Sequence, residues 1–133
     1  MQEKANKSVG AKKQVFIHNL SRQGFKPITA NYCDSFLCRL RGLTFRRYIP
    51  DRWGLLLAQK SDSRLEAAIH MLGVWTDLTV VWINSEAEVV DVRLARKWRL
   101  AYIPQRPASY ILELSPAHLD DFAVGDRINI EST

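Results

Sequence analysis

The chain has 133 residues, of which 47% are hydrophobic and 25% charged, with a formal net charge of +5. This is the size and composition of one globular domain, and it excludes a disordered chain or a fibre. The sequence contains no run of about 18 apolar residues, the length that a bilayer-spanning helix needs, and residues 1–13 lack the apolar stretch of a signal peptide. We therefore expect the protein to be located in the cytoplasm.

The first 13 residues are predicted to form a disordered basic arm. They carry a net charge of +3 and a single bulky aliphatic residue, Val9, a composition typical of unfolded termini. Residues 14–133 are predicted to form a single domain.

Two strands and a short helix are expected next. Residues 14–19 and 28–33 are rich in Phe, Ile, Tyr and Thr and are separated by a polar loop with Gly and Pro, which predicts two strands. A helix should then begin at a cap on Asp34 or Ser35 and end at Gly42. Within this helix, Leu37 and Leu40 are spaced to share one face.

The middle of the chain alternates apolar runs with turns. An apolar run over 53–59 predicts a buried strand, and the polar residues 60–63 favour a turn. A second apolar run covers 65–74, and the β-branched residues of 78–83 predict another strand.

A hairpin and a short final strand complete the expected elements. Residues 84–86 favour a hairpin turn into a strand over 87–94, where alternation predicts that Asp91 and Arg93 lie on a solvent-exposed face. A strand over 110–114 is followed by a short helix with Pro116 in its first turn. A turn at 124–126 and a strand over 127–130 end the chain.

These elements predict an α+β, mostly β fold. About seven or eight short strands and two short helices favour an antiparallel sheet that is barrel-like or folded on itself. Strands and helices do not alternate regularly enough for a doubly wound parallel sheet.

Several short motifs follow one another in an order that resembles the uncharacterised domain-of-unknown-function family 192. Those that carry the resemblance are Arg41-Gly42-Leu43-Thr44-Phe45-Arg46, Gly54-Leu55-Leu56-Leu57, Ala68-Ile69-His70-Met71, Leu78 to Asn84, Tyr110-Ile111-Leu112-Glu113-Leu114 and Val124-Gly125-Asp126-Arg127-Ile128. The resemblance covers residues 15–130 and implies a small, mostly β, barrel-like domain, often exported or membrane-anchored, with no established activity.

The chain departs from that family at a polar cluster. The family that this chain resembles typically has a Met-Lys-Asn-Thr motif followed by a Pro-Leu-Asp motif in the middle of the domain. At these places this chain has Met71-Leu72-Gly73-Val74 and Asp77-Leu78-Thr79. Any chemistry that depends on the missing Lys, Asn and Asp is therefore in doubt here. From residues 1–13 we also expect no export signal, which would be a second departure.

Catalytic and metal-binding patterns are sparse. His18, His70 and His118 fall in three separate elements without the spacing of a metal site. Cys33 and Cys38 lack Cys-x-x-Cys spacing and are interpreted as packed thiols in a reducing compartment. We therefore predict no metal and no cofactor.

Glu113 lies inside an apolar strand. It is either a solvated residue on the outer face or a buried acid, and a buried acid would need a partner such as Arg46 or Arg47, since an unpaired buried charge is costly.

Two basic blocks favour a different kind of partner. Residues 39–52 carry a net charge of +4 and residues 93–106 carry +5, and both mix arginines with aromatic residues. This mixture suits single-stranded nucleic acid, although the same arginines could cover core aromatic rings or pair with the acidic segment 86–91.

The sequence thus favours a non-enzymatic binding or interaction module, with a nucleic-acid-binding domain second and an enzyme acting on an anionic small molecule third. Nucleic acid and an anionic ligand are the partners considered, and the oligomeric state is left open. The candidate binding residues are Arg46, Arg47, Arg52, His70, Arg99 and Glu113.

Overall fold

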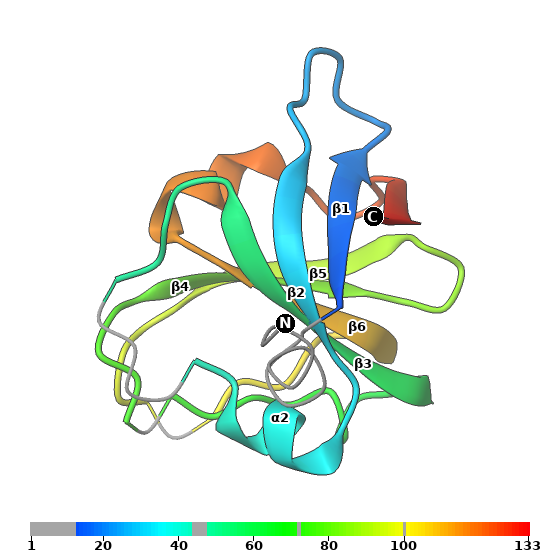
Figure 1. Cartoon of the computed structure of the whole chain (residues 1–133). Helices are drawn as coiled ribbons and strands as arrows, with labels where there is room; N and C mark the ends of the chain where they lie inside the picture. Colours follow the sequence, from blue (N-terminus) through cyan, green and yellow to red (C-terminus); the bar gives the residue numbers. More distant parts are fainter. Residues whose placement is uncertain (1–12, 44–47, 72, 100) are drawn as a thin grey trace, which may run out of the picture.

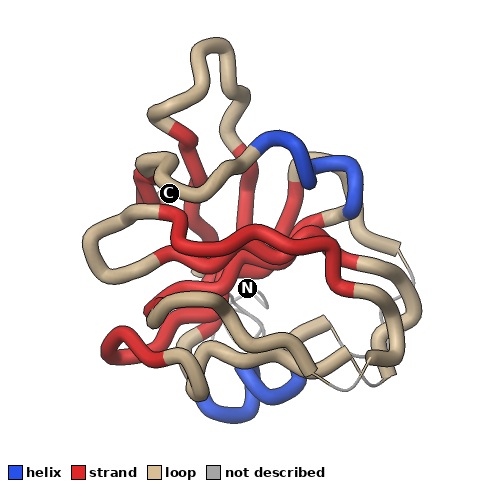
Figure 2. Tube along the Cα trace, turned by 180° about the vertical axis from the view of Figure 1, so that it is seen from behind, coloured by secondary structure: helices blue, strands red, loops and turns tan. Residues whose placement is uncertain are grey.

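The computed structural model describes residues 13–43, 48–71, 73–99 and 101–133, and these residues form a strongly curled seven-stranded sheet (Figure 1). The strands are β1 (Gln14–Asn19), β2 (Ile28–Cys33), β3 (Trp53–Ser63), β4 (Leu78–Ile83), β5 (Val89–Ala95), β6 (Ala108–Leu114) and β7 (Ile128–Ser132). Helix α2 (Phe36–Arg41) and the 3-10 helix η1 (Pro116–Asp121) lie at opposite ends of the sheet (Figures 1 and 2). The predicted mostly β fold with two short helices is confirmed.

The strands follow the order β5-β4-β6-β3-β2-β1-β7. Neighbours are antiparallel except β2 and β3, which run parallel because the chain crosses over through α2 between them. The two edge strands approach each other where the backbone N–H of Val89 donates to Asp126 (2.9 Å) and that of Ile128 donates to Ala87 (2.9 Å). The sheet is therefore folded on itself, as predicted, without closing into a barrel.

Both faces of the central strands are buried, because successive side chains point to opposite faces of a sheet. One face of β3, β4 and β6 joins an inner cluster that includes Ile17, Ile28, Leu56, Val81, Leu112 and Ile128. The other face joins an outer cluster that includes Leu55, Leu57, Val80, Trp82 and Ile111. Two-sided burial explains why β4 has no exposed residue.

The outer cluster is covered by the segment between β3 and β4. The Trp82 indole Nε1 donates to the Ala67 carbonyl oxygen at 2.7 Å, and Ile69 forms a two-residue bridge with Tyr102 through bonds of 2.9 and 3.0 Å. The described residues of the apolar run 65–74 thus form an irregular cover held on the sheet by a few hydrogen bonds. Ala67, Ile69 and Met71 place their side chains in the outer cluster.

Two local expectations about strands were wrong. Strand β3 continues to Ser63 through the predicted turn, because Ser63 pairs with Ala108 of β6 beyond a register shift and Asp62 accepts hydrogen bonds from Ser85 and Ser109. Asp91 of β5 is buried rather than solvated, since it accepts from the Arg93 side chain and from the backbone N–H of Gln105.

Helix α2 has the predicted ends. The Ser35 hydroxyl accepts from the Cys38 N–H at 3.1 Å, and Gly42, at φ 51°, donates its N–H to the Cys38 carbonyl at 2.9 Å. Leu37 and Leu40, however, are 73% and 54% exposed, so the helix does not bury a leucine face. Cys38 packs against the outer cluster instead.

Cys33 and Cys38 form a disulfide that joins the end of β2 to α2. The interpretation of these residues as free, packed thiols was wrong. The cap on Ser35 bends the chain so that the two Cα atoms lie 5.8 Å apart, within the range that a disulfide can bridge.

No helix in the described ranges is long and apolar enough to cross a membrane. Of the predicted basic arm, only Lys13 belongs to these ranges, and its ammonium lies 4.5 Å from the centroid of the Tyr32 ring.

Candidate functional site

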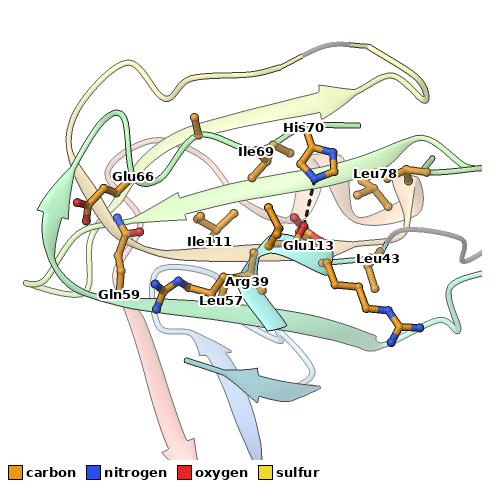
Figure 3. A pocket seen from close by; sticks show the side chains of 15 residues that line it. Arg39, Leu43, Leu57, Gln59, Glu66, Ile69, His70, Leu78, Ile111 and Glu113 are labelled. Atoms are coloured by element: carbon orange, nitrogen blue, oxygen red, sulfur yellow. Dashed lines mark hydrogen bonds between the residues drawn. The ribbon is translucent and has the colours of Figure 1, made fainter. Parts of the chain in front are cut away.

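A cavity of about 380 Å³ opens over the outer cluster, between α2, β3, β6 and the covering segment (Figure 3). Its apolar lining consists of Leu40, Leu43, Leu57, Ala68, Ile69, Val74, Leu78 and Ile111. Its polar lining consists of Arg39, Arg41, Gln59, Glu66, His70 and Glu113. The described lining therefore combines an apolar wall with several polar and charged side chains.

Glu113 reaches this cavity because of its position in β6. It alternates with Leu112 and Leu114, which point into the inner cluster, so its own side chain is on the outer face. Its cross-strand neighbours are Leu55 of β3 and Val80 of β4. An acid is thus placed in the middle of a central strand between two aliphatic residues.

The carboxyl group of Glu113 is strongly desolvated. The residue is 4% exposed, and its Oε1 atom has no hydrogen-bond partner among the described residues. Burial raises the pKa of Glu113 from 4.5 to about 7, because the charged form loses its hydration in an apolar environment. A carboxyl group of this kind exists as a mixture of neutral and charged forms near pH 7.

His70 belongs to the covering segment and turns its ring towards α2 (Figure 3). Its Nε2 atom lies 3.1 Å from the carbonyl oxygen of Leu40. Its Nδ1 atom is buried and has no hydrogen-bond partner in the part of the chain that the structure describes. One ring nitrogen of His70 thus has a hydrogen-bond partner among the described residues, and the other has none.

Arg39 and Gln59 form a fixed polar border on the cavity. The Arg39 guanidinium donates to the backbone carbonyls of Asp34 (2.9 Å) and Ala58 (3.2 Å), and the Gln59 amide donates to that of Ala108 (3.0 Å). Since their partners are backbone atoms of neighbouring elements, these side chains are held in position at the cavity wall.

The predicted site residues separate into three groups. His70 and Glu113 line the same cavity. Arg52 and Arg99 do not line it: the Arg52 guanidinium donates to the Pro27 carbonyl at 2.9 Å, and Arg99 is an exposed residue whose backbone carbonyl accepts from Met71. Arg46 and Arg47 lie outside the described residues, so the pairing of Glu113 with either arginine stays a prediction.

Sequence reasoning missed the part of the site that comes from α2. Arg39, Leu40 and Gly42 enter the cavity wall because the helix lies over the outer face of β3 and β6. The local signal was the helix stop at Gly42 directly before Leu43, but the sequence alone did not show which part of the sheet this helix covers.

The arrangement is suited to hydrogen bonding inside an apolar cavity. The described lining contains no Ser, Thr, Cys or Lys that could act as a nucleophile. Among the described residues, no group of three His, Cys, Asp or Glu side chains is placed to hold a metal ion.

The protein is thus a mostly β domain with a curled sheet and a cavity over the outer face of that sheet. The chain belongs to the uncharacterised family DUF192, described as Uncharacterized ACR, whose model matches residues 17–130. The resemblance found in the sequence motifs is thereby confirmed.

Several relatives of this chain carry the designation UPF0127. A UPF0127 protein of Pyrococcus furiosus is 34% identical over 103 residues, covering 76% of this chain and 85% of that protein. A UPF0127 protein of Thermococcus kodakarensis is 39% identical over 80 residues, covering 60% of this chain and 49% of that protein. The chain thus matches about half the length of the second relative.

Two solved structures share the fold. A protein of Sinorhizobium meliloti, described as a proposed transcription regulator, aligns with a TM-score of 0.78 at 20% identity and covers 90% of this chain and 94% of that one. A protein of unknown function from Novosphingobium aromaticivorans aligns with a TM-score of 0.70 at 14% identity, covering 87% and 83%. At these identities the likeness concerns the fold alone.

Proposed function

We propose that this chain is a binding domain that takes a small organic molecule into the cavity over the outer cluster. One observation carries the proposal: a largely apolar cavity of about 380 Å³ contains two buried polar atoms without partners, His70 Nδ1 and Glu113 Oε1, among the described residues. Cavities of about 300–1,000 Å³ with apolar walls and a few converging polar groups are typical of small-molecule sites.

The lining supports binding of this molecule without its chemical conversion. A buried carboxyl and an imidazole can exchange protons with a ligand, but the described lining offers no nucleophile beside them. If a bound molecule were converted and the conversion were lost in Glu113→Gln, the domain would be an enzyme instead.

A fragment screen tests the proposal. Wild-type protein labelled with ¹⁵N is titrated with a library of small aromatic and aliphatic fragments, and we expect amide shifts around Leu57 and Ile111. The variant Ala68→Trp places a bulky ring at the cavity wall and should abolish these shifts. The matched variant Ala123→Trp carries the same ring at an exposed loop position and should bind as the wild type does. Equal binding by both variants would exclude the cavity as the site.

A second candidate function, binding of single-stranded nucleic acid, is favoured by one exposed aromatic pair. Trp75 and Trp98 are 43% and 49% exposed and their ring centroids are 5.3 Å apart. Trp98 stands in the second basic block between Lys97 and Arg99, where a base could stack on its ring while the cations contact phosphates.

Fluorescence titration with single-stranded DNA and RNA at two salt concentrations tests this candidate. Salt-sensitive binding that is weakened in Trp98→Ala would support it. Binding that disappears when residues 1–12 are deleted, and that Trp98→Ala leaves unchanged, would assign it to the arm instead of the folded domain.

A further inference from the structure

The unpartnered nitrogen of His70 is a hydrogen-bond acceptor. A carbonyl oxygen can only accept, so the 3.1 Å contact with Leu40 places the ring hydrogen on Nε2. In the neutral ring, Nδ1 then carries a lone pair and no hydrogen. This buried acceptor can be satisfied only by a donor that enters from outside the described residues.

The unpartnered oxygen of Glu113 lies under the same end of α2. A Cβ atom built on Gly42 would be 3.6 Å from Glu113 Oε1, so the glycine leaves the carboxyl against the last turn of the helix. His70 contacts that turn at Leu40, two residues earlier. The side chains that carry the two unpartnered atoms, Glu113 from β6 and His70 from the covering segment, therefore both approach the last turn of α2 (Figure 3).

The groups next to the two unpartnered atoms disfavour an ionic head group. Arg39 and Arg41 line the cavity, and Arg39 is held there by two backbone carbonyls. A cationic ligand would meet these guanidinium groups. The Arg39 guanidinium already donates to two backbone carbonyls, and an anionic head group at the two unpartnered atoms would meet the lone pair of His70 and the carboxyl of Glu113, neither of which favours added negative charge.

We propose that the ligand of this cavity has an apolar body and a neutral head group that both donates and accepts hydrogen bonds, such as a hydroxyl or a primary carboxamide. The head group donates to His70 Nδ1 and exchanges a hydrogen bond with Glu113 Oε1, whichever form the carboxyl group takes. The apolar body contacts the aliphatic lining, including Leu57, Val74 and Ile111. This inference rests on the proposed function and adds the chemical class of the ligand.

A series of probes with one ring and different head groups tests the inference. Benzyl alcohol, benzamide, toluene, benzoate and benzylammonium are titrated separately into the full chain, and dissociation constants are measured from amide shifts. We expect the alcohol and the amide to bind at least about tenfold tighter than toluene, the effect of roughly one well-made hydrogen bond. Benzoate and benzylammonium should bind more weakly than the alcohol.

Variants at the two polar residues assign the preference to its atoms. Glu113→Leu should lower the ratio of toluene to benzyl alcohol dissociation constants to what the His70 hydrogen bond alone supports, whereas Glu113→Gln keeps an acceptor and should retain the preference. His70→Phe should reduce the ratio. The control Glu86→Gln removes an exposed carboxylate at the β4–β5 turn and should leave the ratio unchanged. Urea unfolding of each variant confirms that a lost preference does not reflect a lost fold.

The outcomes separate this inference from the proposed function. If no fragment and no probe shifts the cavity amides, both fail. If toluene binds as tightly as benzyl alcohol, or if benzoate or benzylammonium binds most tightly, the cavity is a binding site but the proposed head group is wrong. If Glu113→Leu keeps the full preference, the carboxyl does not recognise the head group and the inference is overturned.

Discussion

Substituting Glu113 should remove a pH dependence from the stability of the domain. The raised pKa of Glu113, about 7 in the folded chain against an ordinary 4.5, means that the native state binds the proton more tightly than the unfolded state does. Stability is then fully present below the unfolded pKa and is lost as the pH rises through the folded pKa. A difference of this size corresponds to about 3 kcal/mol, since each pKa unit is worth about 1.4 kcal/mol.

The assay is urea unfolding followed by tryptophan fluorescence at several pH values from 4 to 9. We expect the free energy of unfolding of the wild type to fall by about 3 kcal/mol relative to Glu113→Gln, mostly between pH 5 and 8. Glu113→Leu should show the same loss of pH dependence and be more stable than the wild type at pH 8, because an apolar side chain replaces a desolvated carboxylate.

An exposed carboxylate provides the control for this prediction. Glu86→Gln changes an exposed carboxylate and should follow the pH profile of the wild type. If wild type and Glu113→Gln kept a constant difference in unfolding free energy from pH 5 to 8, the carboxyl would titrate normally. The account of its burial beneath α2 would then be wrong.

Three further changes test the packing around the sheet. Gly54→Ala should lower the free energy of unfolding by about 1–3 kcal/mol or prevent folding, because the new Cβ would lie 2.8 Å from the Glu113 carbonyl oxygen and against the Leu114 side chain; a wild-type urea midpoint would contradict this. His118→Gln should cost about 1–3 kcal/mol, measured by calorimetry, since the buried ring bonds Asp121 at 2.8 Å and accepts from a backbone N–H; an unchanged melting temperature would count against a structural role. Cys38→Ser should lower the free energy of unfolding by about 2 kcal/mol, because a short cross-linked loop is lost. Adding a reductant should bring the wild type to the same urea midpoint. A wild type that is insensitive to reductant would refute this expectation.

Local sequence signals predicted the elements whose ends are set by local chemistry. β1, β2 and β4 begin and end where turn residues and β-branched runs place them, and the Ser35 cap and Gly42 define α2. β3 was predicted too short because its last residues are polar and are held by Ser85 and Ser109, which are distant in sequence.

The site was predictable only in part for a similar reason. An acid within an apolar strand marks Glu113 as unusual, but its burial depends on the covering segment and on α2, which no local pattern places over β6. The disulfide escaped prediction because five-residue spacing becomes bridgeable only when the strand end and the helix start are bent together. The role of the first basic block was predictable only in part: Arg39 and Arg41 of α2 line the cavity, whereas Arg52 donates to the Pro27 carbonyl.

The two edge strands approach each other, and this contact reduces the strand edge at which folded molecules could pair with one another. Unpaired strand edges offer their N–H and C=O groups to other chains and promote aggregation. Here the hydrogen bonds of Val89 and Ile128 occupy one end of both edges within the same molecule. A sheet whose central strands consist largely of aliphatic residues thereby presents a shortened edge to its neighbours, which lowers the risk of intermolecular strand pairing.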